Sequence, residues 1–197
     1  MKSPYCYIVK PKAARSSARK DIEGKELILN TELQNHQYTS RHGVVINTPL
    51  IGVTPIISED EIIVHHNVFR RFYDVRGNEK NSKSYFKENM FFVEPDQIFA
   101  YKSKDDQWKP MNGFYFVKPL KNNEMFAKDK EVIGKGIIKY GDENLQPGTL
   151  VGFKPGAEYE FIIDGERLYR VPSQSITIKY EYQGDEVEYN PSWLQSS

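Results

Sequence analysis

One ordered set of short motifs occurs twice in this chain, and this repeat constrains the fold more than any other feature. Four motifs return in the same order: Tyr-Ile-Val-Lys-Pro at 7–11 as Tyr-Phe-Val-Lys-Pro at 115–119, Gly-Val-Val at 43–45 as Gly-Ile-Ile at 136–138, Ile-Ile-Val at 62–64 as Leu-Val at 150–151, and Val93, Pro95 and Ile98 as Val171, Pro172 and Ile176. Four matches in one order predict one fold used twice. The spacings differ because the first copy has segments that the second lacks, and those segments are the best clue to function.

The residue pattern of both copies is typical of β-strands. The chain has 13 Tyr and 11 Phe, and its apolar runs are rich in aromatic and β-branched residues. In the run 175–182, Ile176, Ile178 and Tyr180 alternate with polar residues, as expected of a strand with one buried face. No segment shows a convincing helical period. We therefore predict an all-β protein whose copies are small barrels or sandwiches.

A tight hairpin is predicted in the second copy, where Asp164-Gly165 separates two strand-like runs. Both residues accept the positive φ that a two-residue turn requires. The matching place in the first copy is Phe86-Lys87, whose turn chemistry is poorer, so we expect a longer connection there.

The repeat and the breaker residues divide the chain into parts. We expect a first domain at 1–101, a polar linker with Pro110 and Gly113 at 102–113, a second and shorter domain at 114–182, and a C-terminal extension at 183–197. Each domain is large enough to bury a core.

Charge and composition argue against several classes of partner. Lys+Arg and Asp+Glu both total 27, so the formal net charge is zero, which disfavours nucleic acid and membrane surfaces as partners. No apolar stretch reaches the length of a membrane span. The single cysteine, Cys6, cannot form a disulfide framework, and no signal peptide is visible. We expect a cytoplasmic protein.

Catalytic and metal-binding motifs are missing from the sequence. His65 and His66 are adjacent, and neighbouring residues of a strand point to opposite faces, so we expect one inward and one outward histidine and no shared metal. The chain has no Gly-x-Ser-x-Gly, no phosphate-binding glycine loop and no His-Glu-x-x-His. We expect no enzymatic activity, no cofactor and no metal.

The order of the motifs resembles the GroES-like co-chaperonins, the chaperonin-10 family. The closest match is Phe-Ile-Ile-Asp-Gly-Glu at 161–166 followed by Val171 to Ile176, and the double copy is similar to the two-domain plastid form or to a virus-encoded co-chaperonin. The resemblance implies two tandem GroES-like irregular β-barrels and a homo-oligomeric ring. It implies a co-chaperonin that caps a chaperonin (GroEL-like) ring in the presence of nucleotide and assists protein folding, in the host cytoplasm if virus-encoded.

The resemblance also implies a mobile loop, which would span about residues 15–42. Leu27, Ile28 and Leu29 match the family's hydrophobic docking triplet in kind and in order, although Asn30-Thr31-Glu32 replaces the usual small residues after it. The alternative is that the triplet is an ordinary buried strand. The second copy has only 121–135 between the matching strands, so we interpret it as scaffold. The segment 49–55, where the family has a roof hairpin, is short and apolar, which predicts a reduced roof.

A second function stays open at this point. The chain could be a structural or interaction protein, for example a virion component that uses the barrel for assembly. Neutral charge, high aromatic content and the apolar tail with Trp193 and Leu194 fit that reading.

Overall fold

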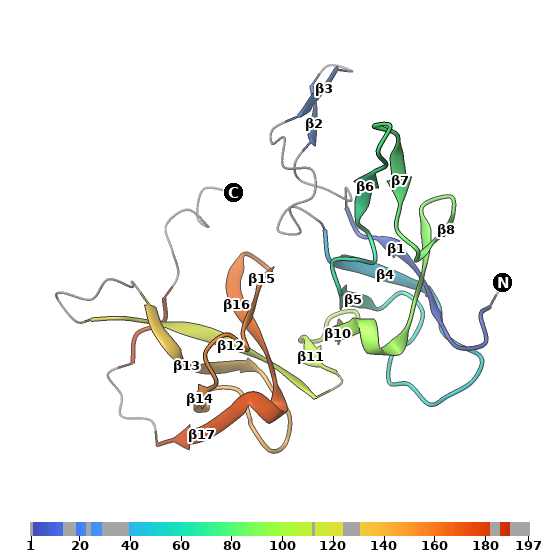
Figure 1. The fold of residues 1–197 in the computed structure, drawn as a ribbon. Coiled ribbons are helices and arrows are strands. Elements are labelled where there is room, and N and C mark those ends of the chain that lie inside the picture. The colour runs from blue at the N-terminus through green and yellow to red at the C-terminus, as the bar shows by residue number, and fades with distance from the viewer. Residues whose placement is uncertain are drawn as a thin grey trace. The chain divides into compact units, whose positions relative to one another are not determined.

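The computed structural model describes residues 2–13, 19–22, 25–28, 40–111, 113–123, 131–181 and 186–189. The chain is all-β, as predicted, and divides into two compact units, 1–108 and 109–197 (Figure 1). The division falls inside the segment 102–113. No helix of the described part is long and apolar enough to cross a membrane.

The first unit contains six strands in the order β10-β5-β4-β1-β9-β8, and the two-residue strand β11, directly after the division, extends this order to the seven-stranded sheet β11-β10-β5-β4-β1-β9-β8. These strands are β1 (Tyr7–Pro11), β4 (His42–Asn47), β5 (Glu61–Val64), β8 (Tyr85–Lys87), β9 (Met90–Val93), β10 (Ile98–Lys102) and β11 (Lys109–Pro110). The one-turn 3-10 helix η2 (Pro95–Gln97) joins β9 to β10. The described strands of this sheet form an open order with two ends, not a closed ring.

The second unit contains a six-stranded sheet in the order β15-β16-β12-β13-β14-β17, also open. Its strands are β12 (Phe114–Lys121), β13 (Glu131–Tyr140), β14 (Leu150–Phe153), β15 (Tyr159–Ile163), β16 (Glu166–Pro172) and β17 (Ile176–Tyr180). The 3-10 helix η3 (Ser173–Ser175) joins β16 to β17, as η2 joins β9 to β10.

The two sheets share one strand order when β11 is left aside, because β8-β9-β1-β4-β5-β10 corresponds to β15-β16-β12-β13-β14-β17. The register agrees as well: Val9, Lys10 and Pro11 of β1 pair with Val45, Val44 and Gly43, and Val117, Lys118 and Pro119 of β12 pair with Ile138, Ile137 and Gly136. The pairing shifts at the same point in both, between Ile8 and Val9 and between Phe116 and Val117. The motif matches found in the sequence are therefore structural equivalences.

Each unit has its own apolar core. In the first, Phe69 and Phe91 pack edge to face with ring centroids 5.0 Å apart, and both are fully buried. In the second, one cluster of buried residues lies on β12, β13, β14 and β16: Tyr115, Val117, Ile138, Val151, Phe153 and Val171. Edge-to-face aromatic pairs add to the burial of apolar area that stabilises such cores.

Both units carry a two-residue hairpin. Asp164 and Gly165 have φ values of 50° and 77°, as their sequence predicts, and they join β15 to β16. In the first unit Glu88 and Asn89, with φ values of 48° and 61°, join β8 to β9. The longer connection expected there is wrong, because the turn lies two residues later than Phe86-Lys87 and Asn89 tolerates positive φ.

Two hairpins of the first unit have no equivalent among the described strands of the second. β2 (Arg19–Ile22) and β3 (Lys25–Ile28) pair with each other within the segment that connects β1 to β4. β6 (Arg71–Tyr73) and β7 (Glu79–Asn81) pair within the segment that connects β5 to β8. In the second unit the corresponding connections are only residues 122–130 and 154–158.

Part of the C-terminal extension is bound to the second unit. The amide of Lys121 donates to the carbonyl of Val187 at 2.7 Å, and the amide of Tyr189 donates to the carbonyl of Pro119 at 2.8 Å. The Lys118 ammonium lies 2.6 Å from the Glu188 carboxylate. Residues 187–189 therefore cover the end of β12.

Candidate functional site

The connection between β1 and β4 is the segment for which the sequence resemblance predicts partner binding. Leu27 and Ile28 lie in β3, where the backbone register places Leu27 opposite Lys20 and Ile28 opposite Arg19. Leu29 lies outside the described residues. Among the described strands, β3 pairs with β2 alone and with neither large sheet. The predicted docking triplet thus begins in a local hairpin rather than in a strand of the main sheet.

Hydrogen bonds and an ion pair fix both ends of this connection to the sheet. Its first residue, Lys12, donates its amide to the His42 carbonyl at 2.9 Å and pairs its ammonium with Glu61 at 2.7 Å. At the other end, the amide of Val64 donates to the carbonyl of Arg41 at 2.9 Å, and the Arg41 side chain is buried. A long connection therefore leaves and rejoins the sheet at neighbouring, fixed points, which is the geometry of a loop presented by a rigid scaffold.

The β6–β7 hairpin is a second excursion from the first unit (Figure 1). Its turn is organised by Asp74, whose Oδ1 accepts the amides of Arg76 and Asn78, both at 2.9 Å. Gly77 completes the turn with a φ of 78°. The hydrogen bond from the Asn78 amide is the main reason that the pKa of Asp74 is lowered from its ordinary value. The sequence analysis did not predict this hairpin, although Asp74 to Asn78 carries turn-forming residues at both ends.

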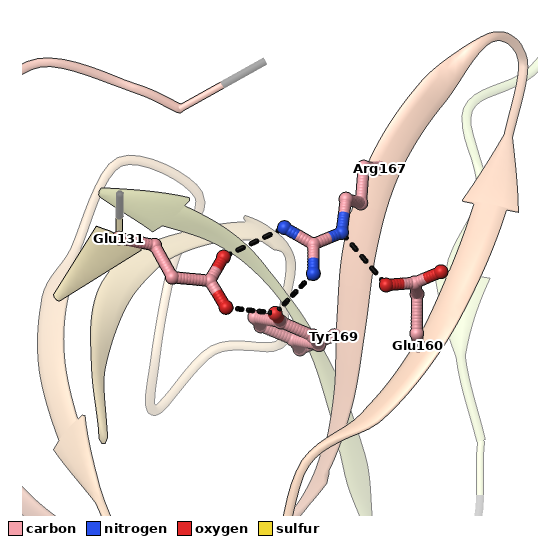
Figure 2. Close-up of polar contacts among 4 residues, drawn as sticks. All are labelled: Glu131, Glu160, Arg167 and Tyr169. Atoms are coloured by element: carbon pink, nitrogen blue, oxygen red, sulfur yellow. Dashed lines mark hydrogen bonds and ion pairs between the residues drawn. The ribbon is translucent and has the colours of Figure 1, made fainter. Parts of the chain in front are cut away.

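The second unit carries a compact polar cluster on β13, β15 and β16 (Figure 2). The Arg167 guanidinium donates from Nη1 to Glu131 Oε2 at 2.6 Å and from Nε to Glu160 Oε2 at 2.7 Å. Its Nη2 donates to the Tyr169 hydroxyl at 2.7 Å, and that hydroxyl donates to Glu131 Oε1 at 2.7 Å. Every polar nitrogen of Arg167 therefore has a partner in the cluster.

The electrostatics of the cluster favour the ionised guanidinium. Burial opposes the charge on Arg167, but the hydrogen bonds to Glu160 and Glu131 outweigh it, so the pKa of Arg167 is raised. Burial and the hydrogen bond to Glu131 raise the pKa of Tyr169, which keeps its phenol protonated. A nearly buried arginine that meets two carboxylates and a hydroxyl is a positioned structural link, not a free anion-binding group.

This link holds the short connection of the second unit. Glu131 is the first residue of β13, directly after the connection that follows β12, and Arg167 ties it to the β15–β16 hairpin. Tyr169 pairs with Val117 as Phe91 pairs with Val9, so the first unit has a buried phenylalanine where the second has the cluster's tyrosine. The two units therefore differ at the end of the sheet where the β1–β4 and β12–β13 connections begin and end.

The histidine pair lies differently from its sequence-based prediction. Strand β5 ends at Val64, so His65 and His66 lie in the segment that follows, and their ring centroids are 4.2 Å apart with an interplanar angle of 32°. The expectation of one inward and one outward ring is wrong because the strand alternation has already ended. Within the described part of the chain, no group of three or more His, Cys, Asp or Glu side chains is placed to hold a metal ion.

No protein-family model matches the chain, and a search of curated proteins finds no match to its sequence.

Proposed function

We propose that the chain is a co-chaperonin, a chaperone that caps a chaperonin ring and assists ATP-dependent protein folding. The observation that carries the proposal is a difference in connection length between two units of equal strand order. Residues 12–41 connect β1 to β4 in the first unit, whereas only residues 122–130 connect β12 to β13 in the second. The ordered motifs that resemble the chaperonin-10 family support the same function. Leu27, Ile28 and Leu29 are the proposed docking residues.

The proposed function requires only binding to the chaperonin and no catalysis by this chain. A loop that orders on binding gives weak affinity for each contact, and several such loops on one oligomer restore affinity through multivalency. Weak single contacts also permit release in each nucleotide cycle. The chain would contribute no catalytic residue and no cofactor, and would act in the cytoplasm, that of the host if the protein is virus-encoded.

The proposed assembly is a homo-oligomeric ring. Both sheets are open in the described residues, the first ending in β11 and β8 and the second in β15 and β17, and association of copies is a common way to cover strand edges. Native mass spectrometry should detect a closed oligomer at micromolar concentration. A monomer throughout that range would count heavily against a co-chaperonin.

Pull-down of a chaperonin with and without nucleotide tests the proposed function directly. We expect retention of the chaperonin by the folded, tagged chain only when ATP or ADP is present. Failure to bind with nucleotide, with circular dichroism showing the β-rich fold, would exclude this function for the chaperonin used.

The alternative is a structural component of a particle. Exposed aliphatic side chains between β4 and β5, such as Leu50 and Val53, favour an assembly role. Recovery of the chain in purified particles, and not free in the cytoplasm, would decide for it.

A further inference from the structure

One edge of strand β12 in the second unit is shared by two partners. β13 pairs with the other edge, whereas β16 pairs with this one only as far as Val117. Beyond that point the C-terminal extension takes over, with Glu188 antiparallel to Leu120. The Lys121 amide donates to the extension, and the Pro119 carbonyl accepts from it. The extension thus adds a short strand where β16 ends.

Strand β1 of the first unit has the same edge. β9 pairs with β1 only as far as Val9, as β16 does with β12. Lys12 donates its amide on the β4 side, so the alternation of an antiparallel ladder turns the Pro11 carbonyl to the other side. Among the described residues, no strand pairs with β1 on that side beyond Val9. An uncovered edge of this kind can accept an extended segment from a partner.

The filled edge of the second unit is a template for the edge of the first. The register that matches Pro11 with Pro119 also matches Ala13 with Lys121. Pro119 and Lys121 provide the two backbone groups that bond to the extension. β12 continues to Lys121, whereas β1 ends at Pro11. An added strand would therefore have the same two groups available once β1 continued to Ala13.

Charge identifies the chemistry of the occupant. Lys118 lies 2.6 Å from Glu188 of the extension. Its equivalent, Lys10, is exposed, and no acidic side chain of the described residues forms an ion pair with it. Lys12 already pairs with Glu61 at 2.7 Å. The edge of β1 therefore offers one uncommitted ammonium beside the Pro11 carbonyl, which favours an acidic residue in the occupant.

We propose that residues 10–13 form a strand-accepting edge that binds an extended acidic peptide segment of a partner protein, antiparallel to β1. The segment would donate one backbone amide to Pro11, accept the amide of Ala13 and place a carboxylate beside Lys10. Main-chain hydrogen bonds would supply affinity, and the carboxylate would supply selectivity. This binding surface goes beyond the proposed function and does not depend on it.

The test adds a synthetic peptide to the full-length chain. The probe has the sequence of residues 185–190, Asp-Glu-Val-Glu-Tyr-Asn, with blocked ends. Hydrogen exchange followed by mass spectrometry should show slower exchange at residues 10–13 when the probe is present. Fluorescence anisotropy of a labelled probe gives its dissociation constant.

Charge reversal tests the predicted ion pair. Lys10→Glu should weaken binding about fivefold or more, because it turns an attraction into a repulsion. A probe carrying Glu188→Lys should bind this variant better than the original probe does. Lys104→Glu is the matched control, since Lys104 is an exposed lysine of the same unit, and it should bind the original probe like wild type.

A third probe tests the backbone hydrogen bonds. N-methylation of the residue that corresponds to Tyr189 removes the amide that donates to Pro119 in the second unit and keeps every side chain. We expect this probe to lose binding. Equal binding of the methylated and unmethylated probes would overturn the inference, because the contact would then be side-chain attraction alone.

Three exchange results would also overturn it. Slow exchange at residues 10–13 in the dilute free chain, unchanged by the probe, would mean that the chain itself fills the edge. Slow exchange that appears only as the chain concentration rises would make a second copy the occupant. Protection confined to residues 118–121 would mean that the probe only replaces the chain's own extension. Retention of a chaperonin is a separate measurement, so its failure would leave this inference standing.

Discussion

Gly136 lies so close to Val117 that a Cβ on this glycine would meet the valine Cγ1 at 2.5 Å. Gly43 has the same relationship to Val9, also at 2.5 Å. In both units the first strand and its partner approach at a point where no side chain fits. This shared constraint explains why glycine begins the repeated Gly-hydrophobic-hydrophobic motif.

Alanine at either glycine should destabilise its own unit, and more so at position 136. A Cβ there would also meet the Lys118 carbonyl oxygen at 2.5 Å, whereas at Gly43 the clashes closer than 3.3 Å are with side chains. Overpacking of this kind costs about 1–3 kcal/mol, and backbone yields less readily than side chains. Urea unfolding of Gly136→Ala and Gly43→Ala measures the loss in the free energy of unfolding at each position.

Gly152→Ala is the control for this pair. The nearest atoms to a Cβ at that position belong to the ring of Tyr180, at 3.1 Å, and this side chain is partly exposed and can move. We expect a much smaller change in the free energy of unfolding. Equal losses at all three glycines would contradict the close-approach argument.

Removing the Arg167 side chain should destabilise the second unit. Arg167→Ala leaves Glu131 and Glu160 without their shared donor, and loss of one partner from such a network costs roughly 1–3 kcal/mol. Arg167→Lys should recover only part of the lost free energy of unfolding, because one ammonium cannot reproduce the forked geometry of the guanidinium.

Arg71→Ala serves as the exposed comparison. Its ion pair with Glu79, at 3.0 Å, is at the surface and should contribute less than about 1 kcal/mol. Similar losses in both variants would show that the Arg167 cluster is no stronger than a surface pair.

The stability of the second unit should fall at alkaline pH. Burial and then the hydrogen bond to Asp142 raise the pKa of Tyr115 to about 12, and burial raises the pKa of Tyr140 to about 12. Since an unfolded tyrosine has a pKa of about 10, the folded state holds these protons more tightly. Their contribution is complete below about pH 10 and is lost as the pH rises toward about 12.

Unfolding midpoints measured from neutral to alkaline pH test this linkage. Tyr115→Phe should flatten the alkaline decline, although it also removes the hydrogen bond to Asp142 and lowers stability at every pH. Tyr5→Phe, at an exposed position, should leave the decline unchanged. An unfolding midpoint that is constant through the tyrosine titration would contradict the raised pKa values.

Sequence reasoning located the sheets because their pairing is encoded locally. The motif that ends at Pro11 and the glycine at position 43 are partners in one ladder, and Pro119 and Gly136 are partners in the other. Motifs that repeat in order therefore predicted both the strands and their correspondence. The same reasoning missed the β6–β7 hairpin, since each strand has only three residues and β7 contains no apolar residue, so no apolar alternation can be recognised.

The Arg167 cluster could not be read from the sequence for a different reason. Its members come from three strands, and Glu131 is 36 residues away from Arg167, so only the folded sheet brings them together. Glu160 and Tyr169 are direct cross-strand neighbours across the predicted Asp164-Gly165 turn. The proximity of these two residues could therefore be predicted from the register of that hairpin.

The docking role of the triplet is tested by Ile28→Asp. If Leu27, Ile28 and Leu29 bind a chaperonin, the change should abolish nucleotide-dependent binding, because every copy in the oligomer loses its anchor at once. Stability should shift by less than about 0.5 kcal/mol, as is usual for surface substitutions. Ile133→Asp is the matched control, since Ile133 is an exposed isoleucine near the start of β13 in the second unit, and it should keep binding.

The opposite reading of the triplet, as a buried strand, makes a different prediction for the same variant. Ile28→Asp would then bury an unpaired charge, which costs several kcal/mol and would unfold the first unit. Thermal unfolding of the free protein separates the two readings before any partner is added. Limited proteolysis adds an independent measurement, because cleavage between Arg15 and Arg41 in the folded chain requires an accessible loop. A large loss of stability in Ile28→Asp, together with resistance to cleavage, would refute the docking role of the triplet.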